Sequence, residues 1–316
     1  MNEPQIEEQI TEKKKDFLLP ASILTAALII AFAWIYTTGP KATQFQKSAI
    51  SASNTGELDE GNTAQAIELP VTWGNLGAQM VVSGVIDRPQ LEALYAQRGG
   101  LASYEKQLLE GDNGKMIITQ ENSGFILNLL WALGLSNKND VLEKGPMADS
   151  RYGDPGQFAS TGGWTIAKGG AMNHYSKHSF ATLAKEQQEL VERVAKNIYR
   201  PCCDNSAYFP DCNHGMAMLG LLELLASQGA SENQMYEIAL PMNAFWFPEQ
   251  YVTIARYFAS KGQILSAVNP KEALGSEYSS ASGFRRIAAL VPQVEREEGS
   301  GCGLEEQKQK SSGCGI

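Results

Sequence analysis

The chain lacks an excess of positive charge. Its 316 residues include 26 Lys and Arg against 35 Asp and Glu, so the formal net charge is −9. Nucleic-acid binding depends largely on cationic side chains that contact phosphates, so nucleic acid is not an expected partner. The same acidic balance gives no reason to expect surface binding to anionic lipid headgroups.

Several motifs are also missing. No repeat of fixed period and no low-complexity block occurs, so a repeat architecture is not expected. The glycine-rich stretch 160–170, STGGWTIAKGG, lacks the residue order of a P-loop, so no nucleotide is expected. The cysteine spacing matches no c-type haem, ferredoxin or familiar zinc-finger motif. Asp204, Asp211 and Glu223 form no evident catalytic pair, and we expect them at the solvated surface.

One long apolar run is present near the N-terminus. Phe17 to Tyr36 contains twenty residues without a charge, which matches the length of a membrane-spanning helix. Lys13, Lys14 and Lys15 lie just before the run, which favours a cytoplasmic N-terminal segment at 1–16. A cleaved signal peptide is the alternative, but its apolar core is usually shorter. We therefore predict a single-pass signal anchor at 17–37, with the lipid bilayer as its partner and the main domain extracytoplasmic.

The rest of the chain divides by composition. Residues 38–65 are rich in Ser, Thr, Gly and Asn and are predicted to form a flexible linker. Residues 66–292 are predicted to form one domain, and 293–316 a disordered tail in which Cys302 and Cys314 are flanked by glycines. Thiols on a flexible arm can exchange with a disulfide or hand over a metal ion. Alternatively, they pair with each other or with a neighbouring molecule.

The domain is predicted to be mainly α, either all-α or α-rich. Gly99 and Gly100 should divide 89–110 into two short helices. Strand patterns are weak, at 71–86 and 115–120 only, and 146–170 is predicted to be a long irregular segment. Further helices are predicted at 125–135, 183–198, 216–225, after a capping box formed by Ser231 and Gln234, and from Pro248 to Gly262.

Donor side chains for soft metals are concentrated in one window. All three histidines and three of the five cysteines lie between residues 174 and 214. Cysteine and histidine are the ligands that zinc and copper prefer. If 172–180 is helical, its two imidazoles lie on one face and can chelate one ion. The candidate metal ligands are Cys202, Cys203, Cys212, His214, His174 and His178.

Cys212 is also the candidate catalytic thiol. An eight-residue loop separates it from Cys203 and could bring the two ends together. Asn213 is the predicted N-cap of the following helix, whose free N–H groups and dipole would favour a thiolate on Cys212 and lower its pKa. Gly215 would allow a close approach by the backbone or a ligand.

Three functions fit this window, and the sequence alone does not choose among them or identify a reaction. The first is a zinc or copper site that exchanges metal or thiols with a donor or acceptor protein. The second is a redox thiol centre in which Cys212 or Cys203 is the nucleophile and His174 or His178 the base. In the third, the protein is a membrane-tethered structural or interaction protein, and Cys212 forms only a stabilising disulfide with Cys202 or Cys203.

Overall fold

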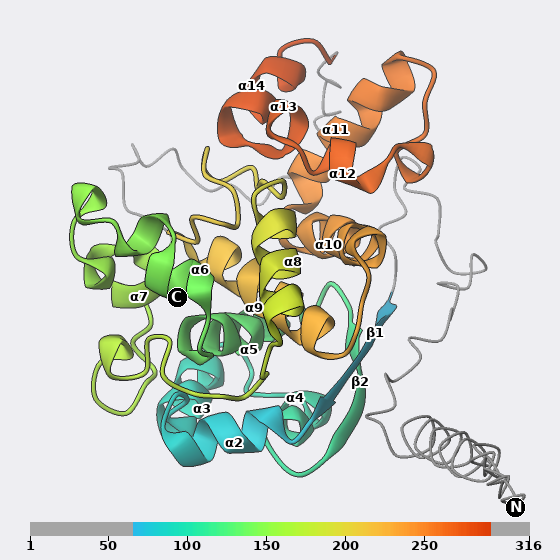
Figure 1. Cartoon of the computed structure of the whole chain (residues 1–316). Helices are drawn as coiled ribbons and strands as arrows, with labels where there is room; N and C mark the ends of the chain where they lie inside the picture. The colour runs from blue at the N-terminus through green and yellow to red at the C-terminus, as the bar shows by residue number, and fades with distance from the viewer. Residues whose placement is uncertain (1–65, 292–316) are drawn as a thin grey trace, which may run out of the picture. The chain divides into compact units, whose positions relative to one another are not determined.

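Two buried helices, α5 (Ser123–Ser136) and α9 (Asn213–Ser227), cross at the centre of the structure (Figure 1). The structure is a computed structural model that describes residues 66–291, all of which lie within one compact unit. Almost every residue of both helices is buried, because both are apolar on every face. The helices predicted at 125–135 and 216–225 are therefore confirmed.

The two central helices touch through their backbones. A Cβ atom added to Gly134 would lie 2.2 Å from the carbonyl oxygen of Met216, and one added to Gly220 would lie 2.2 Å from that of Leu130. No side chain fits at such distances, so glycine at both positions allows the close crossing.

The other α-helices surround this pair. They are α2 (Leu76–Ser83), α3 (Arg88–Ala96), α4 (Ser103–Leu108), α6 (Asp140–Lys144), α7 (Ala159–Gly162), α8 (Lys185–Ala195), α10 (Glu232–Trp246), α11 (Pro248–Ser260), α12 (Pro270–Ala273), α13 (Ser276–Ser279) and α14 (Ala281–Ala288). Short 3-10 helices lie at Pro146–Ala148, Ser150–Tyr152, Pro155–Gln157, Ala171–Asn173 and Leu265–Ala267. The segment 146–170, predicted to be irregular, thus contains only short helical turns.

Several helix boundaries agree with the sequence signals. Gly99 and Gly100 both adopt positive φ and separate α3 from α4. The hydroxyl of Ser231 accepts the N–H of Gln234 at 3.4 Å, and the Gln234 side chain accepts the N–H of Ser231 at 2.9 Å, so the capping box of α10 is present. These features confirm the predicted helix-rich domain across the described residues.

The described residues also contain one small sheet. β1 (Ile67–Gly74) pairs antiparallel with β2 (Asn113–Ile118). The Gln228 side chain, just beyond α9, accepts the N–H of Thr72 and donates to its carbonyl, at 2.9 and 2.7 Å, and so ties β1 to the central helix. The stretch 71–86 is a strand only in its first part, because Leu76–Ser83 forms α2.

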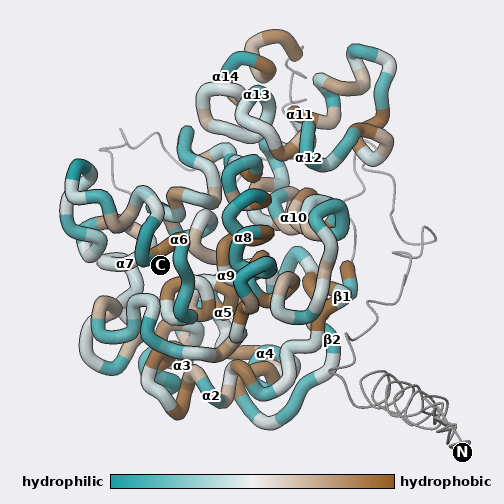
Figure 2. Tube along the Cα trace, in the orientation of Figure 1, coloured by the Kyte–Doolittle hydropathy of each residue, from teal (hydrophilic) through white to brown (hydrophobic). Residues whose placement is uncertain are grey.

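Helix α8 covers α9 with an amphipathic face and leads into the cysteine segment. Val191 and Val194 are fully buried, and hydrophilic residues follow the outer side of α8 (Figure 2). The helix ends at Ala195, earlier than the predicted Ile198. From there to α9 the chain forms only turns and bends, so Cys202 and Cys203 lie in a loop beyond a helix end.

The predicted anchor at 17–37, the linker at 38–65 and the tail with Cys302 and Cys314 lie outside the described residues. Within 66–291, no helix has the length and apolar character that a bilayer crossing requires.

Candidate thiol site

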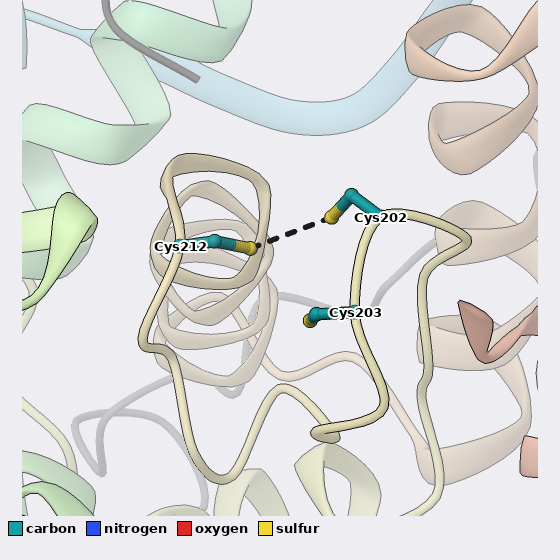
Figure 3. A group of neighbouring side chains, drawn as sticks. All are labelled: Cys202, Cys203 and Cys212. Atoms are coloured by element: carbon teal, nitrogen blue, oxygen red, sulfur yellow. Dashed lines mark hydrogen bonds between the residues drawn. The ribbon is translucent and has the colours of Figure 1, made fainter. Parts of the chain in front are cut away.

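Three cysteine sulfurs converge between α8 and α9. The sulfurs of Cys202, Cys203 and Cys212 all lie within 4.8 Å of one another. Those of Cys202 and Cys212 point toward each other at 3.6 Å (Figure 3). All three are free thiols. The loop thus brings these thiols together as predicted, and their donor atoms are close enough to share one ion.

Hydrogen bonds within the loop hold it in this folded-back shape. The N–H of Ala207 donates to the carbonyl of Ile198 at 2.8 Å. The Asn205 side chain donates to Asp211 Oδ2 at 2.7 Å, and the carbonyl of Asp211 accepts the N–H of Ser160 at 3.1 Å. These hydrogen bonds fix the loop at both ends, so they position Cys202 and Cys203 facing Cys212.

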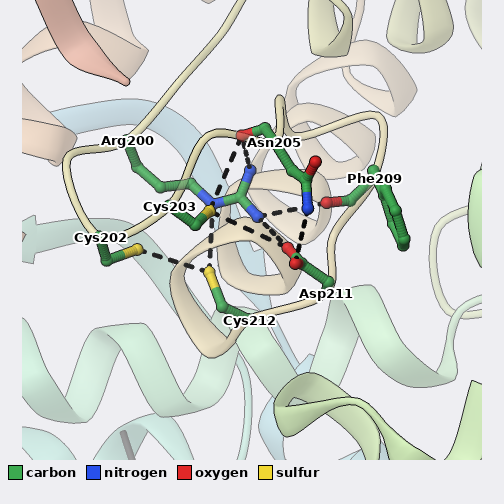
Figure 4. Close-up of polar contacts among 7 residues, drawn as sticks. All are labelled: Arg200, Cys202, Cys203, Asn205, Phe209, Asp211 and Cys212. Carbon is green, nitrogen blue, oxygen red and sulfur yellow. Dashed lines mark hydrogen bonds and ion pairs between the residues drawn. The ribbon is translucent and has the colours of Figure 1, made fainter. Parts of the chain in front are cut away.

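A buried arginine contacts the cysteine cluster (Figure 4). Arg200 is only 1% exposed. Its Nε–H donates to Cys212 Sγ at 3.1 Å, and Nη2 forms an ion pair with Asp211 Oδ1 at 2.7 Å. Nη1 donates to the carbonyl of Asn205 at 2.7 Å and Nη2 to that of Phe209 at 3.2 Å. These contacts satisfy a charge that would otherwise be costly to bury.

Sequence reasoning did not single out Arg200. The available signal was a cationic residue next to Pro201 and the paired cysteines, combined with Gly215 in the first turn of the following helix. A Cβ atom at position 215 would lie 2.4 Å from Arg200 Nη2. The close approach expected at Gly215 is therefore made by the arginine of the same chain.

Negative charge in the cluster is favoured on Cys212. Hydrogen bonds from Cys202 and Cys203, together with the charge of Arg200 and the His214 side chain, hold the pKa of Cys212 well below its usual range despite burial. The pKa of Cys202 is raised, chiefly by its hydrogen bonds with Cys203 and Cys212. The N-cap of α9 is Cys212 itself, not Asn213 as predicted, so the thiol lies directly at the helix N-terminus.

His214 borders the cluster without belonging to the three-sulfur group. Its ring packs against Phe247, with ring centroids 4.4 Å apart. The Nδ1 atom is buried and has no hydrogen-bond partner among the residues that the structure describes. The His214 side chain nevertheless interacts with Cys212 and helps to lower the pKa of that thiol, so the imidazole borders the cluster.

The two other histidines are not part of the three-sulfur group. The segment around them is not an α-helix: Ala171–Asn173 is a 3-10 turn, Ser176 has a φ of 52°, and His178 bridges to Asn137. The imidazoles of His174 and His178 nevertheless meet, with Nδ1 and Nε2 3.1 Å apart. The other nitrogen of His174 contacts the Lys168 carbonyl at 3.1 Å. A role for this pair as metal ligands stays a prediction.

The three acidic residues differ in their environments. Asp204 is exposed, as predicted, and its carboxylate accepts the N–H of Ser282 at 2.7 Å. Asp211 is half-buried against Arg200, and burial raises its pKa. The surface prediction was wrong for Glu223, which is 0% exposed within α9 and accepts hydrogen bonds from the side chains of Asn137 and Asn139.

Comparison with known proteins yields no assignment for this arrangement. No protein-family model matches the chain, and no curated protein or solved structure shows significant similarity to it.

Proposed function

We propose that Cys202, Cys203 and Cys212 bind one thiophilic metal ion, Zn²⁺ or Cu⁺. The main support is that the three sulfurs lie within 4.8 Å of one another. Thiolates that share a metal at a bond length of about 2.3 Å lie roughly 3.8 to 4.0 Å apart. The Cys202 to Cys212 separation of 3.6 Å is already close to that spacing. Thiolate ligands favour zinc and Cu⁺ over magnesium and calcium.

Arg200 supports this function through charge and orientation. Metal ligation requires deprotonated sulfur, and each additional thiolate adds negative charge to a half-buried pocket. The guanidinium places a compensating positive charge 3.1 Å from Cys212 Sγ. An N–H donor to a coordinating sulfur also fixes the direction of that ligand.

His214 offers a way to distinguish the two metals. Zinc in proteins is almost always four-coordinate, so three cysteines leave one position for an imidazole or a water molecule. We propose that His214 fills this position when zinc is bound, since its Nδ1 is buried without a described partner. Cu⁺ has soft-ligand preferences that the thiolates alone satisfy. His214→Ala should therefore weaken zinc binding more than Cu⁺ binding.

We further propose that the site faces the extracytoplasmic side of a membrane, anchored by residues 17–37. The support is the uncharged run from Phe17 to Tyr36 and the lysines before it. At this location the protein would exchange metal with a donor or acceptor protein, and the tail thiols Cys302 and Cys314 could carry the ion to or from the pocket. Protease accessibility in sealed membrane vesicles tests the orientation. Digestion of the domain from the cytoplasmic side would contradict it.

Anaerobic metal analysis of the full-length chain tests metal binding. We expect the reduced protein to bind one equivalent of zinc or Cu⁺, and Cys212→Ser to reduce the affinity by at least about tenfold, as expected for the loss of a metal ligand. Cys302→Ser is the matched control for affinity, because a tail thiol that carries the ion would change the rate of transfer and not the affinity of the pocket. A metal-free wild-type protein whose pocket cysteines are isolated as a disulfide would instead support the structural alternative.

A further inference from the structure

The sulfurs of Cys202 and Cys212 are in direct contact. They are 3.6 Å apart and separated by no other atom of the cluster (Figure 3). A disulfide bond is about 2.05 Å long, so a shift of less than about 2 Å would join them. We propose that an organic disulfide oxidises Cys202 and Cys212 to an intramolecular disulfide, and that this exchange releases the metal from the pocket.

Backbone geometry favours this pair over the adjacent cysteines. Consecutive Cα atoms lie about 3.8 Å apart across a trans peptide, whereas disulfides usually join Cα atoms about 4.4 to 6.8 Å apart. The structure has no cis peptide among its described residues. A bond between Cys202 and Cys203 would therefore require a distorted backbone. Cys202 and Cys212 are ten residues apart in the sequence, so the limit set by a single peptide bond does not apply to them.

Exposure assigns the two sulfurs different roles. Cys202 is the exposed member of the cluster, whereas Cys203 and Cys212 are half-buried. An incoming disulfide thus reaches Cys202 first. Cys203 Sγ faces the protein, 3.8 Å from the Asn205 carbonyl and 3.9 Å from Asp211 Oδ1. Cys212 is held behind Cys202 by the Nε–H of Arg200 at 3.1 Å, in position to attack the sulfur of Cys202.

The exchange takes place in two displacement steps. In the first, the Cys202 thiol passes its proton through the neighbouring Cys212 thiolate to solvent and attacks the organic disulfide RSSR, a Cys202–SR bond forms and one RS⁻ leaves. In the second, the Cys212 thiolate attacks Cys202 Sγ, the bond between the two cysteines forms and the second RS⁻ leaves. The protein loses two electrons, RSSR gains them, and each RS⁻ takes up a proton from solvent according to its pKa. Arg200 is a positioning residue in the second step.

Release of the metal follows from the loss of ligands, and this part of the inference rests on the proposed metal site. A sulfur engaged in a disulfide is no longer a thiolate, so only Cys203 would remain as a thiolate ligand. The ion would then pass to solvent or to another thiol donor. In an oxidising compartment, the bound state would depend on the local thiol–disulfide balance.

Oxidised glutathione serves as the test disulfide for the reduced full-length chain in detergent, with peptide mapping by mass spectrometry. We expect the wild type to form a Cys202–Cys212 disulfide without retained glutathione. Cys212→Ser should retain glutathione on Cys202, because the second displacement is lost. Cys203→Ser is the matched control, and it should still form the Cys202–Cys212 disulfide.

Two results would overturn the exchange: no glutathione adduct on Cys202 in Cys212→Ser, or a wild-type disulfide that joins Cys203 to Cys212 or joins a pocket cysteine to the tail. Zinc release, followed with a chromophoric chelator, should parallel formation of the disulfide in zinc-loaded protein. If the reduced chain binds no metal, the proposed function fails while the mapping still tests the exchange. If zinc stays bound after the disulfide has formed, the release step is wrong.

Discussion

Arg200 occupies the space into which a side chain at position 215 would project. A Cβ atom on Gly215 would lie 2.4 Å from Nη2 and 2.5 Å from Cζ of the guanidinium. The first turn of α9 and the buried charge therefore fit together only because residue 215 has no side chain. Since the same guanidinium contacts Cys212, the glycine controls the environment of the thiol without touching it.

Gly215→Ala should displace Arg200 and destabilise the protein. Alanine in place of glycine normally favours a helix by about 1 kcal/mol, but overpacking at a buried site costs about 1 to 3 kcal/mol. We expect a net loss in the free energy of unfolding, measured by denaturant titration. In an Arg200→Met background the alanine should cost less, since the planar charged group is gone. Equal costs in both backgrounds would show that the two residues are not coupled.

Arg200→Gln should raise the pKa of Cys212, because the positive charge beside the thiolate is removed. The pH profile of Cys212 alkylation, followed by peptide mass spectrometry, should shift to higher pH. Arg200→Lys should shift it less, since lysine keeps the charge but not the planar set of donors. The matched control is Arg285→Gln, which changes an exposed arginine that lies 4.0 Å from Asp204. A wild-type profile in Arg200→Gln would exclude a role for the guanidinium.

Gly220→Ala should separate the two central helices. Its Cβ would lie 2.2 Å from the Leu130 carbonyl oxygen, and neither backbone can yield locally. We expect a loss of about 1 to 3 kcal/mol or more in the free energy of unfolding. Gly124→Ala is the matched control in α5, because a Cβ there meets nothing within 4 Å. That control should be neutral or stabilise the protein by up to about 1 kcal/mol. Similar losses in both variants would contradict this account of the crossing.

Glu223 should make the protein less stable as pH rises. Burial raises the pKa of Glu223 well above the usual glutamate value of 4.5, even though hydrogen bonds from Asn137 and Asn139 act in the opposite direction. Above pH 4.5 the unfolded chain therefore releases this proton before the folded protein does, which favours unfolding until the pH passes the folded pKa. Relative to Glu223→Gln, the wild type should lose stability from about pH 4.5 upward, as measured by denaturant titration at several pH values. A difference that does not change with pH would refute this effect.

The sequence by itself determined the helical framework and a loop length that allows the three thiols to meet. The capping box of Ser231 and Gln234 and the start of α11 at Pro248 follow from contacts within one turn of the chain, so local signals suffice to place them. Eight residues separate Cys203 from Cys212, a length that allows the two ends of the loop to meet. Such features depend on neighbours in the sequence.

The tertiary structure alone decided which groups surround the thiols and which charges are buried. Carbonyls and a carboxylate spread over the loop bind Arg200, and the absence of a side chain at Gly215 leaves room for it. Its role therefore depends on contacts that no local sequence pattern encodes. Glu223 lies among leucines in α9, and the side chains that pair with its carboxylate, Asn137 and Asn139, come from the end of α5 and the turn after it. Burial and charge pairing arise between segments distant in the chain, and therefore appear only once the helices pack.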